Sequence, residues 1–216
     1  MDVQAWARTL THDVRSKWED LRKQSSAFEA GYAVFYSPVK LKPELMIIGY
    51  NPGGGVADFD LEKSMEVPRT HDYLAGYRLA KKMRSLFDEI GKPDLLTSSV
   101  KMNLIFFRSA SAAEWSQIAP GVREDAESFC FGKVTETIET LQPKRILAEG
   151  IKTYSHLRRL LSMSGQEESI LSNGRSLVRT CSSSKVELIG IIHPTGSRIS
   201  RDDWSLIQEN VTRLVA

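Results

Sequence analysis

The stretch MIIGYNPGGG, residues 46–55, joins an apolar run to a turn of unusual composition. The run has the composition of a strand that is buried on both faces. Asn51-Pro52 and three glycines follow it. The phosphate-loop pattern is excluded because no Lys-Ser or Lys-Thr follows the glycines, and the residues after Gly49 do not fit the dinucleotide-binding pattern. Two interpretations remain: a tight turn without a ligand, or a loop in which Gly53–Gly55 bring main-chain N–H groups to a polar ligand beside the Asn51 carboxamide.

Apolar runs and helical periods alternate on either side of this stretch. Further strands are expected at 100–107, 145–150 and 186–194, and apolar residues at helical spacing predict helices at 3–21, 79–90, 126–141, 154–161 and 204–214. The alternation predicts an α/β fold, a three-layer α/β/α sandwich with a central four-stranded parallel sheet. Asn173-Gly174 lies between two short runs and indicates a hairpin.

Length and composition narrow the class of protein. With 216 residues, 41% of them hydrophobic, we expect a single domain over 1–216, with the N-terminal helical segment 1–38 packed on it. The net charge of +2 permits a nucleic-acid partner without indicating one. Two cysteines cannot form a four-thiolate metal site or iron–sulfur cluster. No apolar run approaches the ~20 residues of a membrane helix, and no export signal is recognisable, so a cytoplasmic monomer is expected.

Polar residues follow each predicted strand at its carboxyl end, where ligands bind in open α/β sheets. Asn103 interrupts an apolar strand, and without hydrogen-bond partners its amide would cost about 1–3 kcal/mol. It is either a structural amide or a reader of a nucleobase edge, since it offers a donor and an acceptor side by side. Arg108 is either a solvated side chain or a phosphate contact. His193 ends the last strand, just before Pro194 and a loop of small residues.

Taken in order, GYNPGGG, MNLIFFR, AEGIKTY, the Asn-Gly hairpin and HPTGSR resemble the uracil-DNA glycosylase superfamily, over about residues 40–210. The resemblance implies a DNA glycosylase that hydrolyses the N-glycosidic bond of uracil, or of a related deaminated or mismatched base, in base excision repair. The partner would be DNA with the target base flipped out of the duplex. Such chemistry requires no metal and no organic cofactor.

The resemblance also implies roles for individual residues. Asn51 matches the water-positioning residue, and His193 matches the histidine that hydrogen-bonds the pyrimidine carbonyl as the base departs. Asn103 matches the amide that reads the base. The aromatic ring that stacks on the base is Tyr73 or Phe59. The remaining base-binding residues implied are Gly49, Tyr50 and Gly53, and the DNA-binding residues are Arg108, Thr195, Gly196, Ser197 and Arg198, with Arg198 filling the space left by the flipped base.

Two features depart from the family pattern. Asn51 cannot ionise, so it can orient a water molecule but cannot take its proton. Thr195-Gly196-Ser197 stands where the family usually has Ser-Pro. Asp58 or Glu149 could supply a base instead, or both could be solvated carboxylates. The alternatives are therefore a catalytically weak or inactive module of this fold that binds a nucleobase, nucleotide or DNA, and an enzyme that acts on a free nucleoside or nucleotide.

Overall fold

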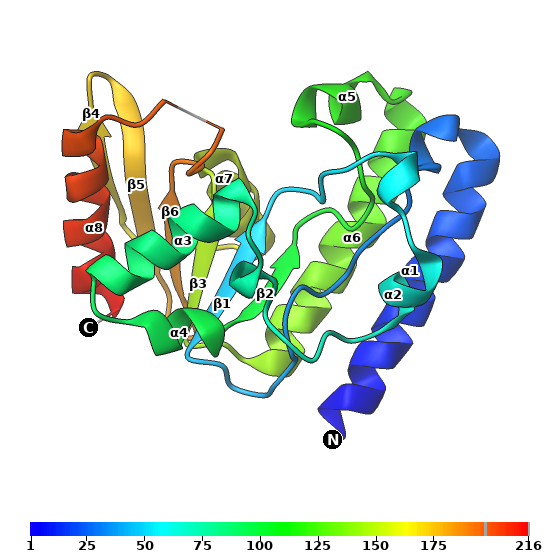
Figure 1. The fold of residues 1–216 in the computed structure, drawn as a ribbon, viewed down its shortest axis with the longest axis horizontal. Coiled ribbons are helices and arrows are strands. Elements are labelled where there is room, and N and C mark those ends of the chain that lie inside the picture. The colour runs from blue at the N-terminus through cyan, green and yellow to red at the C-terminus, as the bar shows by residue number, and fades with distance from the viewer. Residues whose placement is uncertain (197, 216) are drawn as a thin grey trace.

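The computed structural model describes residues 1–196 and 198–215, except for the side chain of Ala112, and contains one mixed sheet with helices on both faces (Figure 1). The strands run in the spatial order β2-β1-β3-β6-β5-β4. Their bounds are β1 Leu45–Gly49, β2 Val100–Asn103, β3 Arg145–Glu149, β4 Glu167–Ser172, β5 Arg175–Ser182 and β6 Glu187–Ile191. The helices are α1 Val3–Gln24, α2 Leu61–Met65, α3 Arg78–Glu89, α4 Pro93–Thr97, α5 Ala112–Gln117, α6 Pro120–Leu141, α7 Ile151–Leu160 and α8 Arg201–Val215. Three single 3-10 turns complete the chain: η1 Ser26–Phe28, η2 Val56–Asp58 and η3 Asp72–Leu74.

The α/β class predicted from the sequence is confirmed, but the sheet is larger than predicted. Strands β2, β1, β3 and β6 are parallel to one another, as expected of the four apolar runs. The hairpin β4–β5 then continues the same sheet, with β5 antiparallel to β6. The prediction of a four-stranded parallel sheet was therefore wrong in extent. The reason is that β4, at the edge, alternates between exposed and half-buried residues and carries little apolar signal.

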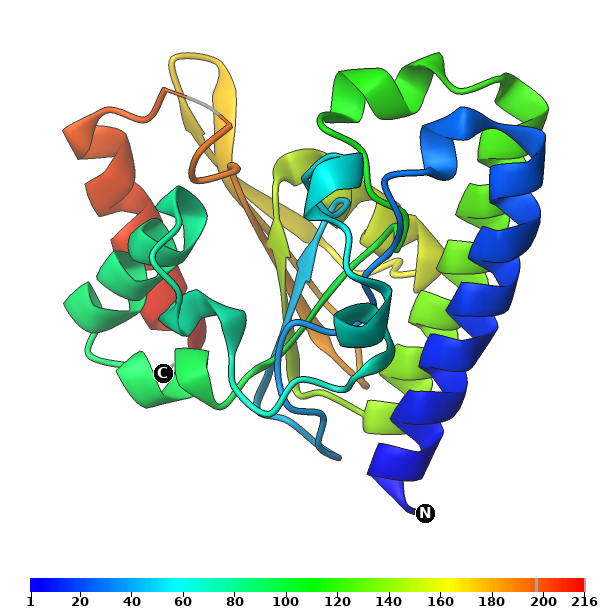
Figure 2. The ribbon, with the colours of Figure 1, turned by 45° about the vertical axis from the view of Figure 1, so that its right-hand side comes forward.

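The two faces of the sheet have separate apolar cores, because neighbouring residues of a strand point to opposite faces. Met46 and Ile48 of β1 pack into the core that also contains α1, α6 and α7. Leu45 and Ile47 pack into the core beneath α3, α4 and α8. Figure 2 shows α1 beside α6 on one side of the sheet, with α3, α4 and α8 on the other.

Helix α1 lies along α6 and is held there by packing and by charge pairs. Its buried residues include Leu10, Val14, Trp18 and Leu21, at the spacing expected of one helical face. Asp2 caps the helix by accepting from the N–H groups of Gln4 and Ala5. Two lysine–aspartate pairs, Lys133–Asp13 and Lys17–Asp125, join α1 to α6.

Gly190 sets the distance between β6 and α7. A Cβ atom at this position would lie 2.5 Å from Cβ of Tyr154, which is fully buried. We expect Gly190→Ala to push α7 away from the sheet and to lower the free energy of unfolding by about 1–3 kcal/mol, measured by urea denaturation. Gly132→Ala in α6 is the control, because outside the helix's own backbone no atom lies within 4 Å of the added methyl group, and it should not lower the stability. A Gly190→Ala variant as stable as wild type would show that the sheet–helix contact yields without cost.

Candidate functional site

The carboxyl ends of the four parallel strands bring several predicted site residues together. In the sheet register, Gly49 of β1 lies beside Asn103 of β2, and Glu149 of β3 lies beside Ile191 of β6. A Cβ atom on Gly49 would lie 2.2 Å from Oδ1 of Asn103 and 3.2 Å from Oε2 of Glu149. Any larger residue would therefore displace the amide and crowd the carboxylate, so glycine at this position leaves room for both groups.

Asn103 is nearly buried, with 7% of its surface exposed. Its amide lies near the hydroxyl of Tyr36, a residue that the sequence reasoning did not consider. Tyr36 is brought to the site by the bridge between Phe35 and Met102 of β2. Burial raises the pKa of Tyr36, and the charge of Asp72 raises it further, so the hydroxyl keeps its proton.

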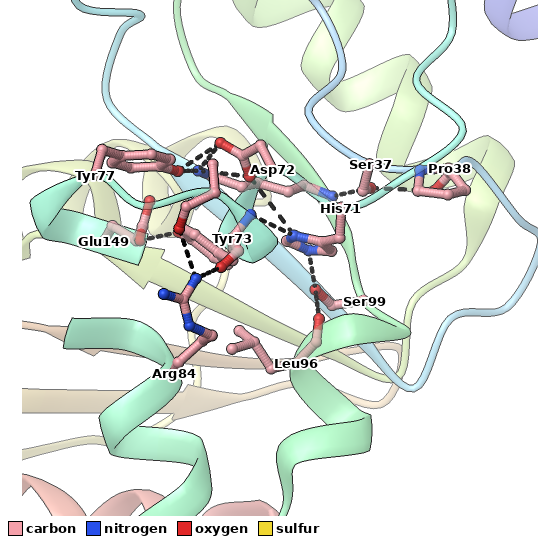
Figure 3. Close-up of polar contacts among 12 residues, drawn as sticks. Ser37, Pro38, His71, Asp72, Tyr73, Tyr77, Arg84, Leu96, Ser99 and Glu149 are labelled. Carbon is pink, nitrogen blue, oxygen red and sulfur yellow. Dashed lines mark hydrogen bonds and ion pairs between the residues drawn. The ribbon is translucent and has the colours of Figure 1, made fainter. Parts of the chain in front are cut away.

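Glu149 is 2% exposed and accepts a hydrogen bond from the hydroxyl of Tyr73 (Figure 3). Burial, and then the negative charge of Glu149, raise the pKa of Tyr73 well above its ordinary value. Tyr73 is thus a permanent donor to the carboxylate. The phenol orients Glu149 without neutralising its charge.

Lys101 is a buried cation beneath the segment that carries Tyr73. It is 4% exposed, and its Nζ lies 2.9 and 3.2 Å from the carboxylate oxygens of Asp72 and 3.1 Å from the hydroxyl of Tyr77 (Figure 3). The same Nζ lies 3.8 Å from the centroid of the Tyr73 ring. Sequence reasoning missed this cluster, although a lysine two residues before Asn103 in an apolar strand was a signal, because both side chains point to the same face.

His193 lies two residues beyond β6 and has a defined tautomer. Its Nδ1 accepts hydrogen bonds from the main-chain N–H groups of Gly196, at 2.9 Å, and Thr195, at 3.3 Å. The proton of the neutral ring is therefore on Nε2. Burial lowers the pKa of His193, the charge of Lys101 lowers it further, and Glu149 opposes both. The side chain is thus a neutral N–H donor near neutral pH.

Asn51 and the glycine loop are tied to the loop that follows β2. Nδ2 of Asn51 donates to Oγ of Ser109 at 2.8 Å and to the carbonyl of Pro52 at 3.2 Å. Arg108 donates from Nε to the carbonyl of Gly53 and from Nη1 to the carbonyl of Asp58. Gly54 has φ +108°, and its Cβ would lie 2.0 Å from Nη2 of Arg108. Gly54 therefore admits the Arg108 side chain, whereas an added Cβ at Gly53 or Gly55 would meet no atom within 4 Å. Arg108 is a loop anchor in this structure.

Neither candidate ring, Tyr73 or Phe59, lies where it could stack on a base. Tyr73 is fully buried and stacks on His71, with ring centroids 5.0 Å apart. Phe59 packs against Trp18 at 5.2 Å and Tyr32 at 5.7 Å, on the side of the sheet that α1 covers. Tyr50 is half-buried, and Nζ of Lys152 lies 4.4 Å from the centroid of its ring.

The loop after His193 is anchored at its far end by the hairpin. Arg198 is exposed, and its carbonyl accepts from Nη1 of Arg175 in β5 at 2.9 Å. Nη2 of Arg175 donates to the buried carboxylate of Asp203 at 3.0 Å. Ser197 lies outside the described residues. The added strands of the sheet thus support the loop on which His193 is held.

Within residues 1–196 and 198–215, no group of three or more His, Cys, Asp or Glu side chains is arranged to hold a metal ion. In the same part of the chain, no helix has the length and apolar character needed to cross a membrane. A comparison with models of known protein families and a comparison with curated proteins both give no match for this chain.

The environment of His71 predicts an acid-sensitive fold. His71 is 3% exposed, its Nδ1 accepts from the N–H of Tyr73, and burial lowers its pKa to about 4. Between pH 6.5 and about 4 the unfolded chain binds a proton here that the folded chain does not, so stability should fall as the pH drops through this window, by about 3 kcal/mol in all. Urea denaturation at pH 7, 6 and 5 measures it.

His71→Gln should remove this part of the pH dependence, because glutamine does not titrate. His12→Gln, at an exposed position of α1, is the control and should keep the slope of the wild type. Parallel slopes for wild type and His71→Gln would mean that His71 is not the group responsible.

Proposed function

We propose that the protein is a DNA glycosylase that hydrolyses the N-glycosidic bond of uracil, or of a related deaminated or mismatched base. The observation that carries the proposal is the state of His193. It is a neutral imidazole with its proton held on Nε2, at the same edge of the sheet as Asn103 and Glu149. One donor, one amide and one carboxylate are thereby available at the carboxyl ends of the parallel strands β2, β3 and β6.

Breaking an N-glycosidic bond leaves negative charge on the departing base and positive charge on the sugar. A fixed N–H donor aimed at the base lowers the energy of that charge separation, and it needs no reorganisation when the bond breaks. The Nε2–H of His193 serves this purpose. Its lowered pKa is suited to the role, because a neutral ring donates a hydrogen bond without giving up its proton.

Asn103 and Asn51 have separate roles in this proposal. The Asn103 amide, at the carboxyl end of β2, reads the polar edge of the base with its donor and acceptor. Asn51 uses Nδ2 on Ser109 and Pro52, so its Oδ1 is the group that accepts a hydrogen bond from a water molecule. Gly196 and Arg198, which are exposed, lie against the sugar–phosphate backbone in this proposal, and Arg198 supplies charge there.

The test is single-turnover excision from oligonucleotides that contain uracil, hypoxanthine or a mismatched base, in single strands and duplexes. Release of any of these bases, followed by cleavage of the abasic product in alkali, supports the glycosylase proposal. No release from any substrate at enzyme excess contradicts it.

A second candidate function is a module of the same fold that binds a nucleobase, a nucleotide or DNA without cutting the bond. The observation that favours it is the packing of Tyr73 and Phe59, which leaves neither ring for stacking on a flipped base. Tight binding of uracil-containing DNA by a protein that releases no base would select this second function.

A further inference from the structure

We propose that Glu149 is the general base of this site, the group that takes the proton from the attacking water, with Tyr73 as its positioning residue. The inference rests on the proposed glycosylase function. It assigns the proton transfer from water to a residue of β3. Asn51 cannot perform this step, because a carboxamide does not accept a proton at neutral pH.

The structure separates the two carboxylates that the sequence left open. Asp58 is exposed, and its Oδ2 accepts from the N–H of Gly55 at 2.9 Å, which closes the turn η2. Glu149 is buried at the strand edge, with Oε2 directed toward Gly49 and the amide of Asn103. Glu149 also lies beside Ile191 in the sheet, two residues before His193 in the chain. Only Glu149 of this pair lies among the residues proposed to bind the base.

The buried cation near Tyr73 is paired with another carboxylate and not with Glu149. Nζ of Lys101 lies 2.9 Å from Oδ2 of Asp72. Glu149 instead accepts from the uncharged phenol of Tyr73, which leaves Oε2 on the side of Gly49 and Asn103. Burying an ionised carboxylate is costly unless it is paired, so a carboxylate held by a phenol in a site is a candidate for chemistry.

The step is a substitution at the anomeric carbon of the target nucleotide. The C1′–N bond breaks and its electron pair leaves with the base, which the Nε2–H of His193 stabilises as an anion. A water oxygen forms a bond to C1′, and one of its protons passes to the Glu149 carboxylate. Solvent then protonates the released base and removes the proton from Glu149, so atoms and charge balance.

Tyr73 is expected to act through Glu149 and not on the substrate. Its hydroxyl fixes Oε1, and its backbone is held by Arg84, which donates from Nη1 to the carbonyls of Tyr73 and Ala75 (Figure 3). Lys101 and His71 contact its ring. This arrangement leaves the carboxylate one preferred orientation.

The test is single-turnover excision by wild type, Glu149→Gln and Asp58→Asn at neutral pH. We expect Glu149→Gln to lower the rate by about 10²-fold with unchanged affinity for DNA, and Asp58→Asn, the matched change of carboxylate to amide, to cut as fast as wild type. Added formate should restore part of the rate of Glu149→Ala, because it supplies a carboxylate to the vacated space.

The outcomes separate this inference from the proposed function. A wild-type protein that releases no base overturns the glycosylase proposal, and this inference with it. A wild type that cuts, with Glu149→Gln cutting equally fast, overturns the role of Glu149 alone. If the Gln variant does not fold, Glu149→Ala decides: a folded Ala variant whose rate formate does not raise overturns the general base.

Discussion

Replacing His193 by alanine is expected to slow single-turnover excision of uracil by about 10²–10³-fold. This is the loss measured when one well-placed donor to a developing negative charge is removed, about 2.7–4 kcal/mol. The fold should tolerate the change, because the side chain is half-buried in a loop and its Nδ1 bonds only to neighbouring residues, Thr195 and Gly196. Circular dichroism at the assay temperature checks the fold.

His12→Ala is the matched control for this experiment. His12 is exposed on α1, on a different element from the strand ends, and its loss should leave the rate unchanged. A His193→Ala variant that is folded and cuts as fast as His12→Ala would remove the imidazole from the mechanism. The proposed function would then need another donor for the departing base.

Lys101→Met is expected to destabilise the fold by about 1.5–3 kcal/mol. Lys101 is 4% exposed, and its loss leaves the carboxylate of Asp72 without the cation that lies 2.9 Å away. That carboxylate is 25% exposed and keeps the hydrogen bond from the Tyr77 hydroxyl, so the loss is that of a charged hydrogen bond and not of a fully buried ion pair. Methionine keeps the apolar stem, so that the change reports mainly on charge. Urea denaturation at pH 7 measures it.

Two further variants test the cause of this loss. Lys101→Met combined with Asp72→Asn should recover part of the stability, because the uncompensated carboxylate is then absent. Lys23→Met removes the cation of the exposed pair with Asp20, and should cost less than about 1 kcal/mol. A loss for Lys101→Met no greater than that for Lys23→Met would contradict the ion-pair explanation.

Much of the parallel part of the fold follows from periodicity. The apolar runs that contain β1, β2, β3 and β6 are buried almost throughout, and such runs are recognisable without knowledge of their partners. The place of the β4–β5 hairpin was not predictable in this way. The Asn173-Gly174 turn indicated that the two strands pair with each other, but the pairing of β5 with β6 depends on contacts that no local pattern encodes.

The residues of the candidate site also differ in how far the sequence predicts their positions. The positions of Asn103 and His193 at one edge of the sheet were predictable, because each stands at the carboxyl end of an apolar run and parallel strands end at one edge. The packing of Tyr73 and Phe59 was not predictable, since residues 56–77 form only short turns and the five-residue helix α2, and the packing of the two rings is decided by distant partners such as Lys101 and Trp18. Arg108 was expected to contact phosphate, and its bonds to the carbonyls of Gly53 and Asp58 could not be read from composition.

The order of strands in the sheet has a consequence for how the chain refolds. The meander β4–β5–β6 forms within residues 167–191. The pairing of β1 with β2, in contrast, closes a loop from residue 46 to residue 100, and its pairing with β3 closes a loop from residue 45 to residue 145. Closing a longer loop costs more entropy before any contact stabilises it, so the nearby pairings form faster. Asn103 and Glu149 belong to β2 and β3, and His193 lies two residues beyond β6. These three strands are joined only by the distant pairings. A nascent or refolding chain therefore acquires the supporting hairpin early and its reactive edge last, and partly folded forms lack the chemistry of the native state.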